Sequence, residues 1–173
     1  MSVLLGKNIS LRALEPEDID FLFAAENNEK YWELSSTQAP FSRHLLENYI
    51  ENAHQDIYEA KQYRFIICNQ IDTPVGMIDM FDFNPLHQRV GIGILILDKH
   101  QQNGYGKEAL ELIIDYAFTY LNIHQLYANI TSDNERSIQL FKKFNFQQVG
   151  IKKDWIFSKS SFKDEILFQL IKK

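Results

Sequence analysis

A short glycine-containing segment, residues 101–106, has the residue types and the position for binding an anion. It reads Gln-Gln-Asn-Gly-Tyr-Gly and lies between an apolar run, residues 92–97, and a long helical pattern. The run is typical of a buried strand, and the glycines give the next turn backbone angles that other residues avoid. A helix that begins at such a turn presents free N–H groups with partial positive charge. The segment therefore predicts a site for a phosphate-bearing ligand.

The residues that flank the two glycines separate three kinds of loop. A Walker A loop needs Ser or Thr after Gly-Lys to ligate magnesium, but Gly106-Lys107 is followed by Glu108. A dinucleotide-binding fingerprint is matched in spacing by Gly104, Gly106 and Ala109, although it lies past mid-chain, after a predicted antiparallel hairpin. A turn that only connects two elements is the third alternative, and a glycine pair alone would favour it.

The surrounding residues predict a mixed α/β fold. Alternating or β-branched runs predict strands at residues 8–14, 63–68, 75–83, 89–97, 125–130, 147–151, 155–158 and 165–171. Helical spacing predicts helices at residues 16–27, at 43–59, from the glycine turn to residue 121, and up to residue 144. Ser132 and Glu135 have the spacing of a capping box, and Asn145 suits a left-handed helix end. Because strands and helices alternate only in the second half, we expect a mostly antiparallel mixed sheet (α+β) flanked by about four helices.

Length and composition favour one folded domain, residues 1–173. A hydrophobic content of 45% argues against disorder. Residues 1–10 lack the pattern of a secretory leader and no apolar run has the length of a membrane span, so we expect a cytoplasmic protein. The net charge of -5 argues against binding to nucleic acid or an anionic membrane. The single cysteine, Cys68, excludes a disulfide framework, and the histidines show no metal-ligand spacing, so we expect no metal.

Two motifs give the chain a family resemblance. Gln101-x-x-Gly104-x-Gly106 resembles the Gln/Arg-x-x-Gly-x-Gly/Ala motif of the GNAT superfamily, the acyl-CoA-dependent N-acetyltransferases. About thirty residues later, residues 134–146 are similar to the family pattern Asn-x-x-Ala/Ser-x-x-x-Tyr-x-x-x-Gly-Phe. Two motifs at this separation are more specific than one, and the order of predicted elements is also similar along nearly the whole chain.

The resemblance is strongest to the ribosomal-protein and spermidine N-acetyltransferase branch. It implies a GNAT-like fold and transfer of an acetyl group from acetyl-CoA, the co-substrate, to a primary amine by direct attack. The implied acceptor is a small polyamine-like molecule or a protein N-terminus, and a homo-oligomer is compatible with the resemblance. The supporting residues are Asn27-Asn28, Tyr31-Trp32, His87-x-Arg89, the segment 115–119 and the closing Phe162-Lys163-Asp164.

The resemblance also implies which residues bind CoA. In the family, backbone amides of the glycine loop hold the pyrophosphate, and a strand beside the CoA arm supplies main-chain contacts. The cofactor-binding residues implied here are Ile94, Leu95, Ile96, Gln101, Gln102, Asn103, Gly104, Tyr105, Gly106, Lys107, Asn134, Phe141 and Lys143.

Two customary proton-handling groups of the family are missing from this chain. Phe141 stands where the motif commonly has Tyr, and Gly91 stands where a strand acid is common. General acid or base help is worth about 10² to 10⁴-fold, whereas positioning is worth about 7 to 11 kcal/mol. Their loss therefore slows acetyl transfer without forbidding it, and an acyl-CoA-binding module with little or no activity is the alternative function.

Three other residues are candidates for proton transfer or amine binding. Asp79 matches an acidic position in the spermidine-type enzymes, and a solvated edge acid is the alternative for it. Tyr31 and Glu33 belong to residues 29–40, a predicted loop in which an aromatic pair and an acid suit an ammonium group. His87 and Tyr127 are further candidates. For His87 the alternative is a surface residue, because a lone histidine in a turn is more often exposed than a base.

Overall fold

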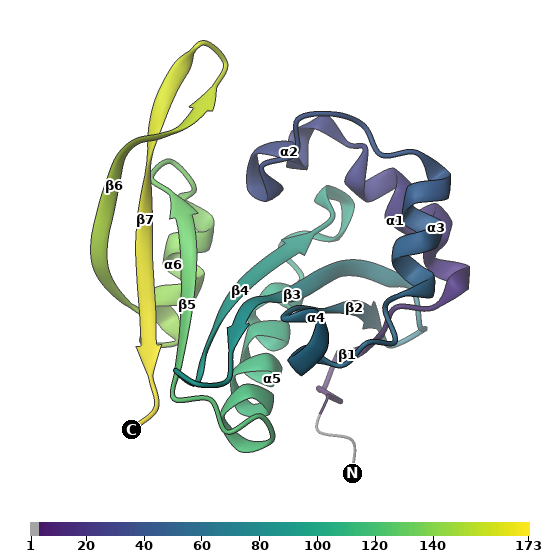
Figure 1. Ribbon diagram of the computed structural model, residues 1–173, viewed down its shortest axis with the longest axis horizontal. Coiled ribbons are helices and arrows are strands. Elements are labelled where there is room, and N and C mark those ends of the chain that lie inside the picture. The colour runs from purple at the N-terminus through teal and green to yellow at the C-terminus, as the bar shows by residue number, and fades with distance from the viewer. Residues whose placement is uncertain (1–3) are drawn as a thin grey trace.

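The computed structural model describes residues 4–173, so residues 1–3 of the predicted domain lie outside the described residues. Seven strands form one sheet in the order β1-β2-β3-β4-β5-β7-β6 (Figure 1). Neighbouring strands are antiparallel except β4 and β5, so the predicted mixed and mostly antiparallel sheet is confirmed. The strands are β1 (Ile9–Ala13), β2 (Tyr63–Asn69), β3 (Pro74–Asn84), β4 (Arg89–Ile96), β5 (Gln125–Thr131), β6 (Gln147–Ser158) and β7 (Ser161–Ile171).

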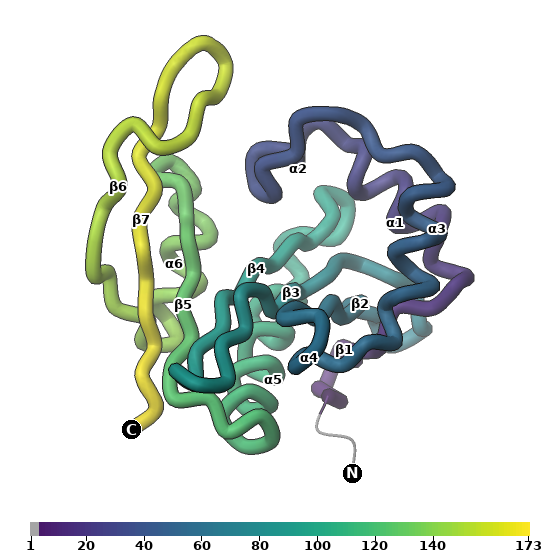
Figure 2. The backbone as a smooth tube through the Cα atoms, viewed as in Figure 1, coloured from purple at the N-terminus to yellow at the C-terminus, as the bar shows by residue number. Residues whose placement is uncertain are grey.

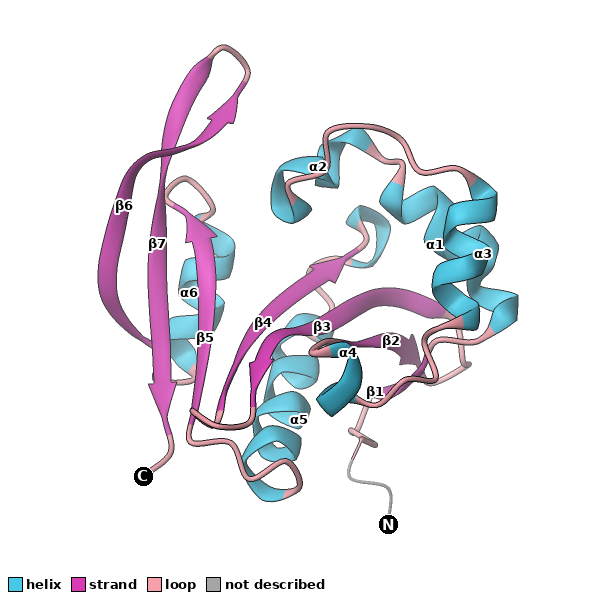
Figure 3. Cartoon of the chain, in the orientation of Figure 1, coloured by secondary structure: helices cyan, strands magenta, loops and turns pink. Residues whose placement is uncertain are grey.

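Helices cover both sides of the sheet, and the described residues contain more of them than the sequence predicted (Figure 3). Where about four were expected, six α-helices and two short 3₁₀ segments are present in residues 4–173. The α-helices are α1 (Ile19–Glu26), α2 (Glu29–Ser35), α3 (Arg43–Glu51), α4 (Ile57–Ala60), α5 (Tyr105–Thr119) and α6 (Glu135–Lys143). The 3₁₀ segments are Pro16–Asp18 and Asp98–His100.

Side-chain caps explain why three helix boundaries differ from the prediction. Asn28 accepts a hydrogen bond from a backbone N–H at the start of α2, so part of the predicted loop 29–40 is helical. Asp56 does the same for α4, which splits the predicted helix 43–59 into α3 and α4. Asn134, rather than the predicted Ser132, caps α6. Each cap satisfies N–H groups that would otherwise lack a partner.

The two predicted strands 147–151 and 155–158 are one strand, β6. Its pairing with β7 is irregular between Lys152 and Ile156, and Asp154 has a positive φ of 49°. Three residues of β6, 153–155, lie opposite the single β7 residue Asp164, and extra residues on one strand of an antiparallel pair produce such a bulge without ending the strand. The β6–β7 hairpin therefore continues past the bulge and extends beyond the rest of the sheet (Figure 1).

Alternation along β2 divides the core between the two faces of the sheet. Phe65 and Ile67 belong to the cluster that packs with α5 and α6, whereas Ile66 and Cys68 belong to the cluster under α1 and α3. The tube view shows α5 and the α1–α3 group on different sides of β2 and β3 (Figure 2). Both faces are thus filled, and Cys68 is a buried side chain as predicted.

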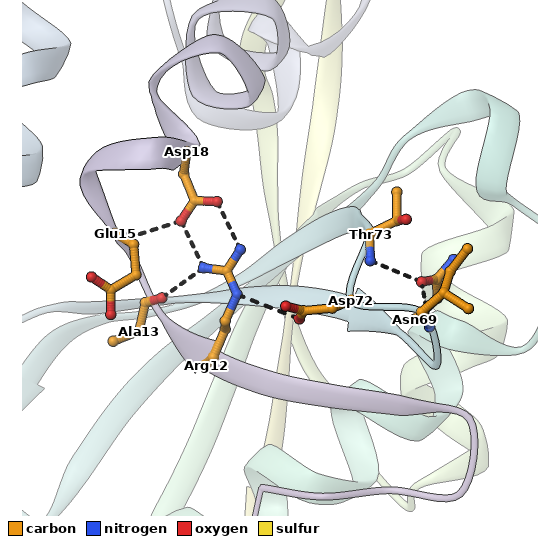
Figure 4. Close-up of polar contacts among 8 residues, drawn as sticks. Arg12, Ala13, Glu15, Asp18, Asn69, Asp72 and Thr73 are labelled. Carbon is orange, nitrogen blue, oxygen red and sulfur yellow. Dashed lines mark hydrogen bonds and ion pairs between the residues drawn. The ribbon is translucent and has the colours of Figure 1, made fainter.

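An ion pair fixes β1 to the segment that leads into α1 (Figure 4). Arg12 donates to both carboxylate oxygens of Asp18, at 2.7 and 2.8 Å, and Asp18 also accepts from the Glu15 N–H. Burial alone would raise the pKa of Asp18, but the hydrogen bond from Arg12 holds it below its ordinary value. The carboxylate therefore stays charged and anchors the first helix.

The sheet opens between β4 and β5. The two strands pair only where Arg89, Val90 and Gly91 lie opposite Gln125, Leu126 and Tyr127. Beyond these pairs the strands diverge, as Figure 1 shows. The backbone of β4 from Ile92 onward is therefore free of β5 on that side, and the gap leads toward the glycine loop.

Candidate functional site

A cavity of about 700 Å³ lies where β4 and β5 diverge. Its walls are the end of β4, the glycine loop with the start of α5, one face of α6, and α2. The volume is in the range of small-molecule and cofactor sites. Four elements that are far apart in the sequence thus build one site.

The glycine loop has the geometry that the sequence predicted. Gly104 is the N-cap of α5 and has a φ of 77°, in the left-handed region that glycine adopts at least cost. A side chain at this position would meet no atom within 4 Å, so the space above the loop is open. The N-terminus of a fifteen-residue helix therefore faces free volume, as an anion site requires.

Gln101 braces this loop from inside. Its side-chain amide donates to the Ile96 carbonyl at 3.3 Å and to Asp98 at 3.1 Å, and its oxygen accepts from Arg136 of α6. The loop is thereby tied to the end of β4 and to α6. Three cationic side chains, Lys107, Arg136 and Lys143, also line the cavity and complement an anionic ligand.

Most residues predicted to bind the cofactor lie on this cavity. The lining includes Ile94, Leu95, Ile96, Gln101, Gln102, Gly104, Tyr105, Gly106, Lys107, Asn134 and Lys143. Asn103 instead donates to the carbonyls of His100 and Gln101 and faces a second hollow beside Asn8. The three β4 residues are half-buried rather than buried, because this strand edge faces the cavity.

Phe141 lies in the core. Its side chain is 2% exposed and packs edge-to-face on Phe146, with ring centroids 4.9 Å apart. The ring is thus a packing element, and its position offers no support for contact with the cofactor. The missing hydroxyl at this residue is consistent with an apolar environment, where a phenol would need a partner.

Phe81 explains the glycine at position 91. A Cβ on Gly91 would come within 2.3 Å of the Phe81 ring, so the ring occupies the space of a side chain there. Phe81 also packs edge-to-face on Tyr127, whose hydroxyl lies 3.3 Å from Asp82. Burial raises the pKa of Tyr127 to about 12, so this phenol keeps its proton at neutral pH.

Asp79 is held in a partly buried ion network. Arg64 donates to both oxygens of Asp79 at 2.7 Å and also pairs with Glu26 at the end of α1. Burial and these carboxylates act on Arg64 in opposite directions, and its pKa is raised overall. A carboxylate with both oxygens occupied is a poor proton acceptor. These contacts favour a structural role for Asp79 over the predicted role as base.

Tyr31 and Glu33 lie on the α2 wall of the cavity. The Tyr31 hydroxyl accepts from the Asp98 N–H at 3.0 Å and thereby ties α2 to the end of β4. Glu33 contacts the closing hairpin, where Ser158 and Lys163 donate to its two oxygens at 2.6 and 2.7 Å. These hydrogen bonds, first that of Lys163, lower the pKa of Glu33 below its ordinary value. Tyr31 and Glu33 thus both lie on the cavity wall, and each already has a hydrogen-bond partner within the protein.

Several charged lining residues were not found from the sequence. Arg136, Lys30 and Asp133 line the cavity, and Lys163 bridges Glu33 and Asp133. Charged residues on exposed helix faces and in turns are common, so their types alone carry no signal. Only the fold brings them together.

Asn134 combines a cap with a place on the cavity wall. Its side chain accepts from the Ser137 N–H at 3.2 Å. We expect Asn134→Ala to lower the free energy of unfolding by about 1 kcal/mol, because the cap is lost. Asn134→Ser, which keeps a capping oxygen, should retain most of that stability. Chemical denaturation of both variants measures the difference, and equal losses would contradict the capping role.

Most of the chain matches one known protein family. The model described as "Acetyltransferase (GNAT) domain" matches residues 8–147, which span β1 to the start of β6. The chain belongs to the GNAT acetyltransferase family. The matched region contains the glycine loop, the β4–β5 opening and α6, so it covers the elements that build most of the cavity. The GNAT protein is accordingly an acetyl-CoA-dependent N-acetyltransferase.

Curated relatives share about a quarter of their residues with this GNAT chain. The spermidine N(1)-acetyltransferase of Vibrio cholerae is 25% identical over 149 residues, covering 84% of this chain and 83% of the relative. The enzyme of the same name from Escherichia coli is 27% identical over 147 residues, covering 83% and 75%. An uncharacterized N-acetyltransferase of Bacillus subtilis, YokL, is 28% identical and covers 94% and 89%.

Solved structures match the GNAT fold over nearly the whole chain. The spermidine N-acetyltransferase of Vibrio cholerae in complex with CoA and spermine has a TM-score of 0.88 and 22% identity, with 96% of each chain covered. A dodecameric structure of that enzyme has a TM-score of 0.82 and 24% identity, covering 96% of this chain and 95% of the other. At this identity, the likeness shows the fold alone.

Two further findings concern metals and membranes. Among residues 4–173, three or more His, Cys, Asp or Glu side chains do not come together as a metal-binding group. The absence of a metal from the reaction stays a prediction. No helix in the described part of the chain combines the length and the apolar character needed to cross a membrane.

Proposed function

We propose that the protein transfers the acetyl group of acetyl-CoA to the primary amine of a small molecule or of a protein N-terminus, by direct attack of the amine. The observation that carries this proposal is the open N-terminus of α5, capped by Gly104, at one end of a cavity between diverging strands. The family motif around Gly104 supports the same placement.

The residues of the cavity suit CoA in two respects. The backbone N–H groups of the glycine loop and the cations Lys107, Arg136 and Lys143 would hold its phosphates. The free edge of β4 at Ile94, Leu95 and Ile96 would receive the arm through main-chain groups, since the side chains of these residues are apolar. Acetyl-CoA supplies the activated acetyl group as a thioester.

The chemistry requires two proton movements. The new bond joins the amine nitrogen to the acetyl carbon as the carbon–sulfur bond breaks, so the nitrogen loses a proton and the sulfur gains one. Phe141 and Gly91 have no titratable group, and Asp79 is bound by Arg64. We propose that positioning in the cavity supplies most of the rate and that water carries the protons.

A thiol-release assay with a panel of amines tests the function. We expect free thiol to appear only when acetyl-CoA and a primary amine are both present, and not with tertiary amines of similar charge, because a tertiary nitrogen has no proton to lose. The panel should contain monoamines, polyamines and a short peptide with a free N-terminus. Calorimetric binding of CoA with no thiol release on any amine would reject the transferase reaction and support the binding module.

A further inference from the structure

Lys163 of β7 pairs with two carboxylates at once. Its Nζ lies 2.7 Å from Glu33 Oε1 and 2.6 Å from Asp133 Oδ2. Glu33 belongs to α2 and Asp133 follows β5, so three separate parts of the chain meet at one ammonium group. Because Glu33 and Asp133 both line the cavity, they form a cation site on its wall. The chain fills this site with its own side chain.

The ion pair between Lys163 and Glu33 is partly shielded from water. The side chains of Lys163 and Glu33 are 24% and 26% exposed, whereas that of Asp133 is 55% exposed, and Ser158 donates to the second oxygen of Glu33. The hydrogen bond from Lys163 lowers the pKa of Asp133 as it does that of Glu33. Both carboxylates are therefore charged at neutral pH, and together they would attract a cation if Lys163 were absent.

The remaining carboxylate on the cavity wall is also paired. Lining carboxylates in the described residues are Glu33, Asp98 and Asp133, and Asp98 lies 3.4 Å from the ammonium group of Lys30. A wall whose carboxylates all have cationic partners offers little attraction to additional ammonium groups of a ligand. An amine with one positive charge does not need such additional sites.

We propose that Lys163 is a specificity-determining residue that disfavours polycationic acceptors by occupying the Glu33–Asp133 site. The acceptor is accordingly an amine with a single positive charge. This inference rests on the proposed function, because it concerns the amine of the same reaction. A polyamine must displace Lys163 and replace two charge-assisted hydrogen bonds, whereas a monoamine leaves them intact.

Removing the ammonium group should open the site to an external cation. In Lys163→Met, we expect spermidine to bind the complex of the chain with CoA about tenfold or more tightly than in the wild type. Isothermal titration calorimetry measures this affinity, and CoA without an acetyl group prevents turnover. The gain should shrink at high salt, because it is electrostatic.

Three further variants test whether the gain in spermidine affinity comes from the Glu33–Asp133 site or from the change in the net charge of the protein. Lys163→Arg keeps the cation and should show no gain. Lys153→Met removes a 74% exposed lysine that pairs with Asp164 at 2.7 Å, and it should also show no gain. Adding Glu33→Gln and Asp133→Asn to Lys163→Met should abolish the gain, since the freed carboxylates are then neutral. Lys163→Gln, which keeps hydrogen-bond donors without charge, replaces Lys163→Met if circular dichroism shows that the latter does not fold.

The outcomes distinguish this inference from the proposed function. Unchanged spermidine affinity on loss of the Lys163 charge, an equal gain in Lys153→Met, or a gain that survives neutralisation of both carboxylates would each overturn the role of Lys163. Absence of thiol release with every amine would instead count against the proposed function, while the binding measurement would remain readable. If both hold, kcat/KM for spermidine rises about tenfold in Lys163→Met, and the rise for a monoamine is smaller because it carries a single charge.

Discussion

Replacing Gly104 with valine is expected to weaken CoA binding by about 100-fold or more, which corresponds to the loss of one or two charge-assisted hydrogen bonds. The residue has a φ of 77°, a conformation that a β-branched side chain avoids. The loop must therefore change its backbone angles, and the N–H groups at the start of α5 then turn away from the phosphates. The new side chain also fills the open space above the loop.

Gly150→Val is the matched control for this substitution. Gly150 lies on β6, its φ is not positive, and a Cβ there would meet no atom within 4 Å. The same change in side chain is thus made without backbone strain, and CoA affinity should be unchanged. Calorimetric titration with CoA compares the two variants, after circular dichroism has established that both are folded. Wild-type affinity in folded Gly104→Val would reject the placement of the phosphates at this loop.

Replacing Arg64 with methionine is expected to lower the free energy of unfolding by about 3 kcal/mol, because it leaves two carboxylates without their partner in a largely buried place. Side chains of Arg64, Glu26 and Asp79 are 17%, 13% and 32% exposed. For a domain of this size, the melting temperature should fall by roughly 6 to 12 °C. Thermal unfolding followed by circular dichroism measures the shift.

Arg43→Met tests whether the effect comes from burial. Arg43 also pairs with an acid, Asp20 at 2.8 Å, and it lies over the Phe23 ring as Arg64 lies over the Tyr49 ring, but its side chain is 48% exposed. An exposed pair contributes about 0 to 1 kcal/mol, so the melting temperature should change little. Adding Glu26→Gln and Asp79→Asn to Arg64→Met should recover part of the lost stability. Equal shifts for Arg43→Met and Arg64→Met would contradict the buried network.

Local signals in the sequence were sufficient to predict the elements that form the proposed CoA-binding part of the cavity. The glycine loop, the helix that follows it and the strand before it each depend on residues near one another in the chain, so turn chemistry and periodicity predicted them correctly. The left-handed helix end at Asn145, with a φ of 65°, was also predicted correctly, for the same local reason.

The acceptor side could not be predicted in this way. Lys163 and Glu33 are separated by 130 positions, and their contact depends on how the closing hairpin lies beside α2. The Phe81 ring that fills the space beside Gly91 comes from a different strand. Asp79 looked like a free strand acid because its partner Arg64 lies on the neighbouring strand β2. Such pairings are set by the register of the sheet rather than by local composition.

The most direct test of acetyl transfer to a primary amine is to follow an isotopically labelled acetyl group from acetyl-CoA by mass spectrometry. The wild-type chain is incubated with labelled acetyl-CoA and a mixture of primary amines, and both the small molecules and the intact protein are analysed. Direct transfer in this cavity predicts that the label moves to the nitrogen of a primary amine, that the chain itself remains unlabelled, and that Gly104→Val greatly reduces the transfer at sub-saturating acetyl-CoA. Label that stays on acetyl-CoA with every amine, or that accumulates on the chain, would contradict direct transfer in this cavity.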